Sequence, residues 1–122
     1  MKEELKIKEK VKIFNPQNTK NFMEIELIVD TGATFSCIKK EKLEKLNIKP
    51  LYKRKFKTAD GRIVERDVGA CLFEIPKKGK TISEVIFGEK EDIEVLGLHT
   101  LEGMALTINT KTGELKPIEL TF

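Results

Sequence analysis

The sequence predicts one mostly β domain, residues 1–122, with one or two short helices. Two observations predict this class. Apolar and charged side chains alternate with a period of two along several segments, which is typical of strands with one solvated face. Turn residues, among them Asn-Pro, Asp-Gly and Pro-Lys-Lys-Gly, separate these segments at short intervals. The runs of helix-forming residues are short by comparison, so the balance of elements favours strands.

The composition is typical of a globular protein with an ionic surface. Hydrophobic residues make up 39% of the 122 residues and charged residues 35%, and a chain of this length can bury a core without disulfides or metals. The 23 basic and 20 acidic residues are interspersed, so we expect no nucleic-acid partner. No apolar run is long enough to span a bilayer, and the N-terminus lacks the apolar core of a secretion signal. We therefore expect a cytoplasmic protein without a membrane partner.

Cysteine and histidine are scarce. Cys37 and Cys71 lie far apart in the sequence without C-x-x-C spacing, and we expect both thiols to be reduced and buried. The single histidine, His99, has no fixed relation to either cysteine, and we expect it on a helix surface. The acidic residues within 89–92 lack the pattern of a calcium loop and predict a solvated turn. The sequence predicts no metal site and no cofactor.

The first half of the chain predicts a hairpin and then a short helix. Residues 5–14 place apolar side chains on one side and lysines on the other, as in a half-buried strand. Residues 15–18 supply turn chemistry, and residues 22–29 form a second strand that becomes continuously apolar near its end. Residues 39–46 are rich in helix formers and predict a helix.

Residues 52–75 predict a long hairpin. Ala59-Asp60-Gly61-Arg62 lies between two strand-like runs, and Asp-Gly there predicts a type I′ turn, which needs positive φ at both central positions. In the second arm, Gly69 predicts a bulge or a point where another backbone passes close. The remaining expected elements are strands at 81–87 and 93–97, a helix at 98–104 and a terminal hairpin over 105–109 and 114–120.

One strand ends in an unusual way. The apolar run Leu27-Ile28-Val29 stops at Asp30, and Thr31-Gly32-Ala33 follows as a turn of small residues. Gly32 lets backbone reach the carboxylate, Thr31 offers a hydroxyl beside it, and Ala33 avoids crowding. A carboxylate held at a fixed depth beside N–H donors can have a tuned pKa and can act as an acid or a base. The alternative is a structural Asp that hydrogen-bonds its own backbone in an Asx-turn.

In this segment the chain resembles the retropepsin-like aspartic proteases, whose active site is a hydrophobic-hydrophobic-Asp-Thr/Ser-Gly-Ala/Ser loop. Residues Ile28 to Ala33 match that loop at every position. In that family a flap hairpin follows, and then a hydrophobic-hydrophobic-Gly segment with a helix; residues 56–69, Val95-Leu96-Gly97 and 98–103 are similar to these. The resemblance covers most of the chain and is to the small cellular and prokaryotic members. It implies a closed β-barrel with a flap hairpin.

The resemblance also implies an aspartic endopeptidase that hydrolyses extended peptides as a homodimer. Such chemistry needs two close carboxylates, and a chain with one Asp-Thr-Gly obtains the second from a partner through twofold symmetry. A water activated between the two Asp30 carboxylates would attack the peptide, with Thr31 locking the two loops together and Gly32 contacting carboxylates and substrate. The implied catalytic residues are therefore Asp30, Thr31 and Gly32. The implied substrate-binding residues are Ala33, Ala59, Asp60, Gly61, Arg62, Ile63, Val95 and Leu98.

Two features depart from the retroviral members of the family. Those enzymes pair an Asp just after the loop with an Arg just after the later glycine, and Thr34 and Leu98 stand at these positions here. The loss of both partners together avoids a stranded buried charge, which costs on the order of 3–5 kcal/mol. The tip Asp60-Gly61-Arg62 is also polar, which predicts either charged substrates or simply an exposed tip that stays soluble.

Two other functions are alternatives. The missing charge pair and the polar tip are compatible with a catalytically weak or inactive module of the same fold that dimerises or binds peptides. The basic run from Lys53 to Lys57 is the second alternative, a nucleic-acid site whose affinity would fall steeply with salt. Tyr52 offers almost no stacking platform beside that run, so a solvated strand face is the simpler interpretation.

Overall fold

The computed structural model describes residues 7–122. Within them, 53% of residues lie in strands and 10% in helices, so the predicted mostly β class is confirmed. The strands are β1 (Ile7–Asn15), β2 (Asn18–Val29), β3 (Ser36–Lys39), β4 (Tyr52–Lys57), β5 (Ile63–Ile75), β6 (Gly79–Gly88), β7 (Val95–Leu96), β8 (Leu106–Ile108) and β9 (Leu115–Pro117), and the helices are α1 (Lys40–Lys45) and α2 (Leu98–Gly103).

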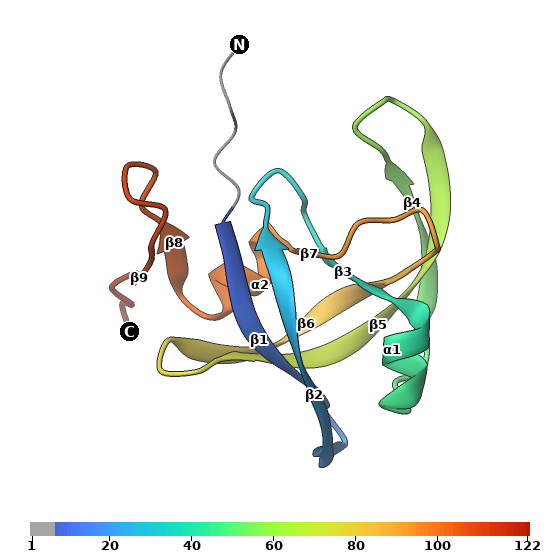
Figure 1. Cartoon of the computed structure of the whole chain (residues 1–122), viewed down its shortest axis with the longest axis horizontal. Coiled ribbons are helices and arrows are strands. Elements are labelled where there is room, and N and C mark those ends of the chain that lie inside the picture. The colour runs from blue at the N-terminus through green and yellow to red at the C-terminus, as the bar shows by residue number, and fades with distance from the viewer. Residues whose placement is uncertain (1–6) are drawn as a thin grey trace.

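Six strands close into a ring (Figure 1). Neighbours hydrogen-bond in the order β1, β2, β7, β3, β6 and β5, a pairing between β1 and β5 closes the circle, and β4 adds to the outer edge of β5. Strand pairing in the ring is shortest at β7, which pairs through two positions with β2 and through one with β3. The predicted closed sheet is therefore present, as a ring of paired strands rather than a continuous barrel.

β1 and β2 form the predicted hairpin. They pair antiparallel along their length, and the alternation of the sequence sets which side chains face inward. Val11 and Ile13 are fully buried, and the lysines between and before them lie on the wetter face. The strand predicted at 5–14 runs over Ile7–Asn15, and Leu5 lies outside the described residues.

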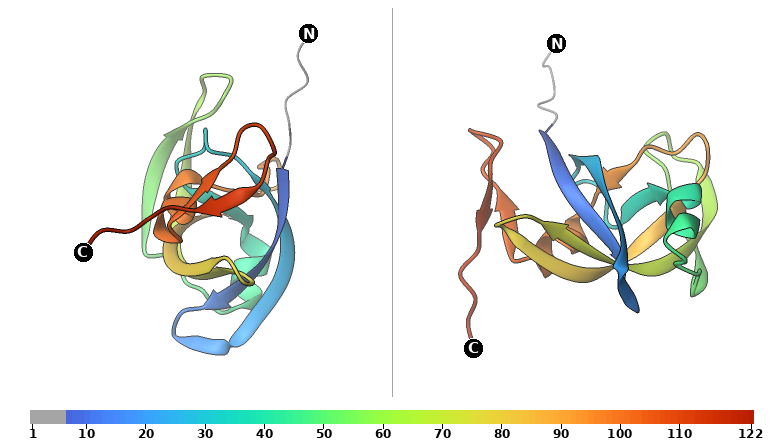
Figure 2. Two further views of the ribbon diagram at one scale, coloured as in Figure 1. Left: turned by 90° about the vertical axis from the view of Figure 1, so that its left-hand side faces the viewer. Right: turned by 60° about the horizontal axis from the view of Figure 1, so that its bottom comes forward.

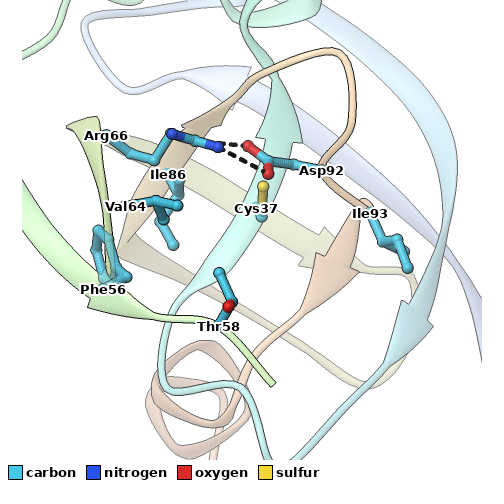
Figure 3. A pocket seen from close by; sticks show the side chains of 8 residues that line it. All are labelled: Cys37, Phe56, Thr58, Val64, Arg66, Ile86, Asp92 and Ile93. Atoms are coloured by element: carbon cyan, nitrogen blue, oxygen red, sulfur yellow. Dashed lines mark hydrogen bonds and ion pairs between the residues drawn. The ribbon is translucent and has the colours of Figure 1, made fainter. Parts of the chain in front are cut away.

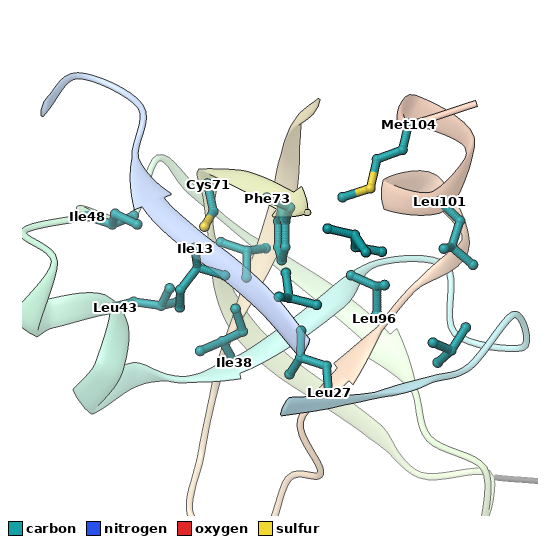
Figure 4. Close-up of a cluster of buried hydrophobic side chains, with 14 of the residues drawn as sticks. Ile13, Leu27, Ile38, Leu43, Ile48, Cys71, Phe73, Leu96, Leu101 and Met104 are labelled. Carbon is teal, nitrogen blue, oxygen red and sulfur yellow. The ribbon is translucent and has the colours of Figure 1, made fainter. Parts of the chain in front are cut away.

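The core fills the inside of this ring (Figure 4). Apolar side chains from strands on all sides converge there, and each helix adds a side chain from its inner face. The largest of the fully buried side chains are Phe73, Ile13, Leu27, Ile38, Leu43, Leu96 and Leu101. Since Leu43 belongs to α1 and Leu101 to α2, both helices are attached to the ring through its core.

Both helices are shorter than predicted. α1 stops at Lys45 because the chain reaches a left-handed conformation at Asn47, where φ is 59°. α2 stops at Gly103, and Ala105 then takes a φ of 57°. Neither of these two helices, the ones found within residues 7–122, has the length and apolar character needed to cross a membrane.

The turn between β4 and β5 differs from the prediction. A type I′ turn needs positive φ at both Asp60 and Gly61, but only Gly61 has it, at 86°. The Gly61 N–H donates to the Thr58 carbonyl over 2.9 Å, as in a type I turn followed by a left-handed glycine. The Thr58 hydroxyl accepts the Arg62 N–H over 3.1 Å and closes this wider loop. The type I′ prediction is wrong because a threonine two residues before Asp60 offers the competing hydrogen bond.

Gly69 marks a close approach rather than a bulge. β5 pairs with β4 and β6 without a register shift around it. A Cβ at Gly69 would lie 2.9 Å from the ring of Phe87 and 3.0 Å from the Lys49 carbonyl oxygen. Cys37 and Cys71 are both free and buried, as predicted.

The predicted terminal hairpin forms a separate two-stranded sheet of β8 and β9. Figures 1 and 2 show this small sheet on the side of the molecule opposite to β4. It is attached through Leu106 and Leu115, which are buried in the core. The strand predicted at 93–97 is limited to Val95–Leu96.

Candidate active site

Asp30 begins the loop that joins β2 to β3. Its N–H donates to the Leu96 carbonyl over 3.0 Å, so strand pairing with β7 continues for one residue beyond β2. Its Oδ1 accepts the N–H of Gly32 over 2.9 Å, and its carbonyl accepts the N–H of Ala33 over 3.1 Å. A Cβ at position 32 would lie 3.2 Å from Oδ1, so glycine gives the backbone room to reach the carboxylate. The side chain of Asp30 is exposed in the single chain.

The hydrogen bond from Gly32 to Asp30 is the one expected of an Asx-turn. It engages one carboxylate oxygen and fixes the orientation of the side chain. Because Asp30 is exposed, its other oxygen is accessible to water or to a second protein chain. The loop therefore combines a structural hydrogen bond with a presented carboxylate.

The start of α2 lies against the far side of the loop. The Leu98 N–H donates to the Ala33 carbonyl over 2.8 Å, and the His99 N–H donates to the Thr34 carbonyl over 3.0 Å. Thr34 and Leu98 are the positions at which retroviral members of the resembled family carry a charged pair. In this chain, backbone hydrogen bonds make the connection.

Gly97 and Phe35 bring two backbones into direct contact. A Cβ at Gly97 would lie 2.5 Å from the carbonyl carbon of Phe35, which only glycine avoids. The buried ring of Phe35 packs edge-on against Phe56 of β4, with 5.6 Å between centroids, and lies 5.3 Å from the ring of His99. His99 is exposed on α2, as predicted. One aromatic side chain thus connects the Asp30 loop, the β4–β5 hairpin and α2.

The tip of the β4–β5 hairpin, residues 59–62, is exposed, and so is the next residue, Ile63. Arg62 Nε lies 3.0 Å from Asp60 Oδ2. Hydrogen bonds, first from the Thr58 hydroxyl and then from Arg62, hold the pKa of the Asp60 carboxyl below its usual value. Figures 1 and 2 show the hairpin tip and the Asp30 loop projecting from the same end of the molecule.

A pocket of about 180 Å³ lies between the β4–β5 hairpin and the segment that precedes β7 (Figure 3). Its walls are mainly apolar, with Arg66 and Asp92 on one side and Thr58 on the opposite side. The lining residues are Cys37, Phe56, Thr58, Val64, Arg66, Ile86, Asp92 and Ile93. The pocket has the chemistry of a site for an apolar side chain.

An ion pair forms the polar side of this pocket (Figure 3). Arg66 Nε donates to Asp92 Oδ2 over 2.7 Å and Nη2 donates to Oδ1 over 3.1 Å, in a bidentate arrangement. The side chains are only 12% and 22% exposed, and the hydrogen bonds from Arg66 lower the pKa of the Asp92 carboxyl. The prediction of a solvated turn is wrong for Asp92, although Glu91 is exposed.

Lys39 holds the same turn from the other side. Its Nζ donates to the carbonyls of Glu89, over 3.0 Å, and Lys90, over 2.7 Å, and to that of Asp92. Its backbone N–H donates to Glu94 Oε2 over 2.9 Å. Cationic side chains from β3 and β5 therefore fix the turn that forms one wall of the pocket.

The basic run on β4 is also used within the chain. Lys53 Nζ lies 2.9 Å from Asp67 Oδ1 on β5. The guanidinium of Arg54 lies over the rings of Phe35 and Tyr52, at 5.6 and 5.2 Å from their centroids. Two of the cations of this run thus make contacts with the chain's own side chains.

The structure brings part of the predicted set together. Ala33, Val95 and Leu98 surround the Asp30 loop as half-buried residues, and Thr31 is exposed beside it. Ala59, Asp60, Gly61, Arg62 and Ile63 stand apart on the hairpin. The residues lining the pocket lie outside the predicted set. Phe56 and Val64 are cross-strand partners that share one face of the hairpin. The predicted type I′ turn at Asp60-Gly61 would pair Phe56 with Glu65 instead, so the sequence carries no signal for this pair.

The pocket thiol is not a nucleophile. Burial, with a smaller contribution from Asp92, raises the pKa of Cys37 to about 12, so the thiol stays protonated at neutral pH. Among the described residues, no three His, Cys, Asp or Glu side chains lie together as metal ligands would. The exposed carboxylate of Asp30 is suited to acid–base chemistry.

A family model described as gag-polyprotein putative aspartyl protease matches residues 18–103. This range holds the Asp30 loop, the β4–β5 hairpin and α2, and it covers well over half of the chain. The chain belongs to this aspartyl protease family. The retropepsin-like fold predicted from the sequence is thereby confirmed. The search of the curated proteins found no match to this chain.

Proposed function

We propose that this protein is an aspartic endopeptidase that acts as a homodimer on extended peptides. The observation that carries the proposal is the Asp30 loop, because the chain has one Asp-Thr-Gly and presents its carboxylate at the surface. Aspartic protease chemistry needs two carboxylates so close that they share a proton. A twofold axis beside the loop would supply the second one, since a symmetric dimer brings each patch against its own copy.

In the proposed dimer, one Asp30 carboxylate is ionised and removes a proton from a water molecule held between the pair. The other is protonated and donates to the oxygen of the scissile carbonyl, which gives a tetrahedral intermediate without a covalent enzyme adduct. The hydrogen bond from Gly32 supports this role because it orients Asp30, and Thr31 is exposed where it can hydrogen-bond across the axis. Acid–base catalysis of this kind supplies about 10²–10⁴-fold.

In this proposal the β4–β5 hairpin is the flap. An extended peptide binds beneath it by strand addition, with backbone hydrogen bonds along the chain, and closure of the tip at 59–62 excludes water. The pocket lined by Phe56 and Val64 receives an apolar side chain of the substrate. Arg66 is already paired with Asp92, so we expect the pocket to favour uncharged side chains.

Replacing Asp30 with Asn tests the proposed chemistry. Asn keeps the size of the side chain but cannot act as an acid or a base, so we expect peptide-library cleavage to fall at least about 10²-fold from acidic to neutral pH. Asp67→Asn is the matched control, since that carboxylate of β5 pairs with Lys53 of β4, and it should leave cleavage unchanged. Equal cleavage by wild type and Asp30→Asn would overturn the proposal.

A second candidate is a catalytically inactive module of the same fold that dimerises or binds peptides. The Asx-turn hydrogen bond from Gly32 to Asp30 fits this candidate as well, because it forms within one chain and needs no second carboxylate. Sedimentation separates the candidates in part, since a strict monomer at high concentration cannot pair two Asp30 side chains. A dimer that binds peptides without cleaving them would support the module.

A further inference from the structure

A chain of hydroxyl groups connects three elements next to the Asp30 loop. Ser36 opens β3, Thr100 lies in α2 and Ser83 lies in β6. The Gly97 N–H donates to Ser36 Oγ over 2.9 Å, the hydroxyls of Ser36 and Thr100 are 2.6 Å apart, and Thr100 Oγ1 donates to Ser83 Oγ over 3.0 Å. Ser36 and Thr100 are fully buried.

The proton positions along this chain follow from the donors available. An amide N–H can only donate, so Ser36 Oγ accepts from Gly97. Each hydroxyl has one proton, and that of Thr100 goes to Ser83. The proton of Ser36 therefore goes to Thr100, and all the bonds run in one direction, an arrangement in which each bond polarises and strengthens the next.

Gly97, the first donor of this hydroxyl chain, lies between the two residues to which the Asp30 loop is hydrogen-bonded. Its neighbour Leu96 accepts the N–H of Asp30 over 3.0 Å, and its other neighbour Leu98 donates to Ala33 over 2.8 Å. A displacement of the Gly97 backbone therefore moves both attachments of the loop that presents the carboxylate.

Simple space filling does not account for these residue types. A buried hydroxyl needs a partner, whereas alanine or valine of similar size would fill the same space without that requirement. Here each buried hydroxyl both accepts and donates, and the hydroxyl chain continues through the half-buried Ser83, whose Oγ donates to the Glu84 carbonyl over 3.4 Å. The arrangement imposes a direction and a distance on the Gly97 amide that apolar side chains could not impose.

We propose that Ser36 and Thr100 are positioning residues, whose hydroxyl chain fixes the Gly97 amide and thereby holds Asp30 in its catalytic geometry. This inference rests on the proposed protease function. The two residues act through Gly97 and the loop backbone rather than by touching the substrate. Removing a hydroxyl should therefore lower kcat while the pocket and hairpin still bind peptide.

Thr100→Val tests the proposal, because valine keeps the shape of threonine but can neither accept from Ser36 nor donate to Ser83. We expect kcat to fall by about tenfold to a hundredfold, as for a small misplacement of reacting groups, with KM changed less than about twofold. Thr100→Ser restores the hydroxyl and should bring kcat back to within about threefold of wild type. Amide hydrogen exchange at Gly97, followed by NMR, should be faster in Thr100→Val than in wild type or Thr100→Ser.

The control is Thr107→Val. Thr107 is a half-buried threonine of β8 that takes no part in the hydroxyl chain, so this substitution should leave kcat unchanged. Should Thr100→Val fail to fold, Ser36→Ala removes the same link, and its kcat and Gly97 exchange decide instead. Thermal stability lowered with kcat and Gly97 exchange unchanged would overturn the proposal and leave a purely structural role. If the wild-type protein cleaves no peptide, the proposed protease function is overturned. The exchange rate of the Gly97 amide in wild type and in Thr100→Val reports separately whether the hydroxyl chain holds that amide.

Discussion

Gly97→Ala is the substitution for which the structure predicts the largest effect from a single methyl group. The added Cβ would lie 2.5 Å from the carbonyl carbon of Phe35, 2.6 Å from its oxygen and 2.8 Å from the N of Ser36. These are backbone atoms, which cannot rotate away as a flexible side chain can. Ordinary van der Waals contact begins at 3.4 Å, so the two backbones must separate by the difference from 2.5 Å, about 0.9 Å.

A separation of that size breaks the hydrogen bonds that cross between the two segments. Those from Asp30 to Leu96, from Gly97 to Ser36 and from Leu98 to Ala33 measure 3.0, 2.9 and 2.8 Å. Overpacking costs about 1–3 kcal/mol and each of the three lost hydrogen bonds about 1 kcal/mol, so we expect the free energy of unfolding to fall by about 4–6 kcal/mol. Because a 1 Å misplacement can cost about 10²-fold in rate, kcat should fall by a similar factor.

Urea titration and peptide cleavage measure the two effects. Gly79→Ala is the control, since its Cβ would meet Met104 at 3.2 Å, a contact that needs a shift of only a few tenths of an ångström. It should change stability by less than about 1 kcal/mol and leave kcat unchanged. A Gly97→Ala variant with the stability and kcat of wild type would show that the close approach at Phe35 is not needed to place the loop.

Two further predictions concern the pocket and the thiols. Asp92→Asn deprives Arg66, whose side chain is 12% exposed, of its bidentate partner, and should lower the free energy of unfolding by about 1–3 kcal/mol at neutral pH. Arg66 holds the pKa of Asp92 below its ordinary 3.8, so this stabilisation is present above pH 3.8 and is lost as the pH falls further. A difference in free energy of unfolding between wild type and Asp92→Asn that grows toward acid pH would contradict this prediction. Burial raises the pKa of both Cys37 and Cys71 to about 12, so both should resist iodoacetamide at neutral pH until urea unfolds the chain. Rapid alkylation of the native protein would contradict that.

The features predictable from the sequence are those set by neighbouring residues. Alternation in β1 identified the buried Val11 and Ile13, because a strand has a strict period of two. The abrupt end of β2 at Asp30 identified the loop that presents the carboxylate. Gly69 predicted either a bulge or a close approach, since few other reasons place a glycine inside a strand, and the structure has the close approach.

The features that escaped prediction depend on residues far apart in the chain. Asp92 pairs with Arg66 across 26 positions, and nothing local distinguishes its carboxylate from its exposed neighbours. Ser36 and Thr100 meet across 64 positions, so neither residue alone indicates a hydroxyl chain. The type I′ turn failed for a different reason, because the dipeptide rule does not include the Thr58 hydroxyl that closes the loop.

The two halves of the candidate site are held by different forces. The Asp30 loop is attached to β7 and α2 by backbone hydrogen bonds and buried hydroxyls, which carry no net charge. The pocket wall at 89–94 is attached by Lys39 and Arg66, which hold it through charge. Acid weakens the Arg66–Asp92 pair when Asp92 gains a proton, whereas backbone amides and hydroxyls do not titrate in that range. In the proposed mechanism the Asp30 carboxylate gains and loses a proton, and the loop that carries it rests on groups that do not titrate with it. Where retroviral members have a charged pair, the backbone hydrogen bonds from Leu98 to Ala33 and from His99 to Thr34 hold the loop in this chain.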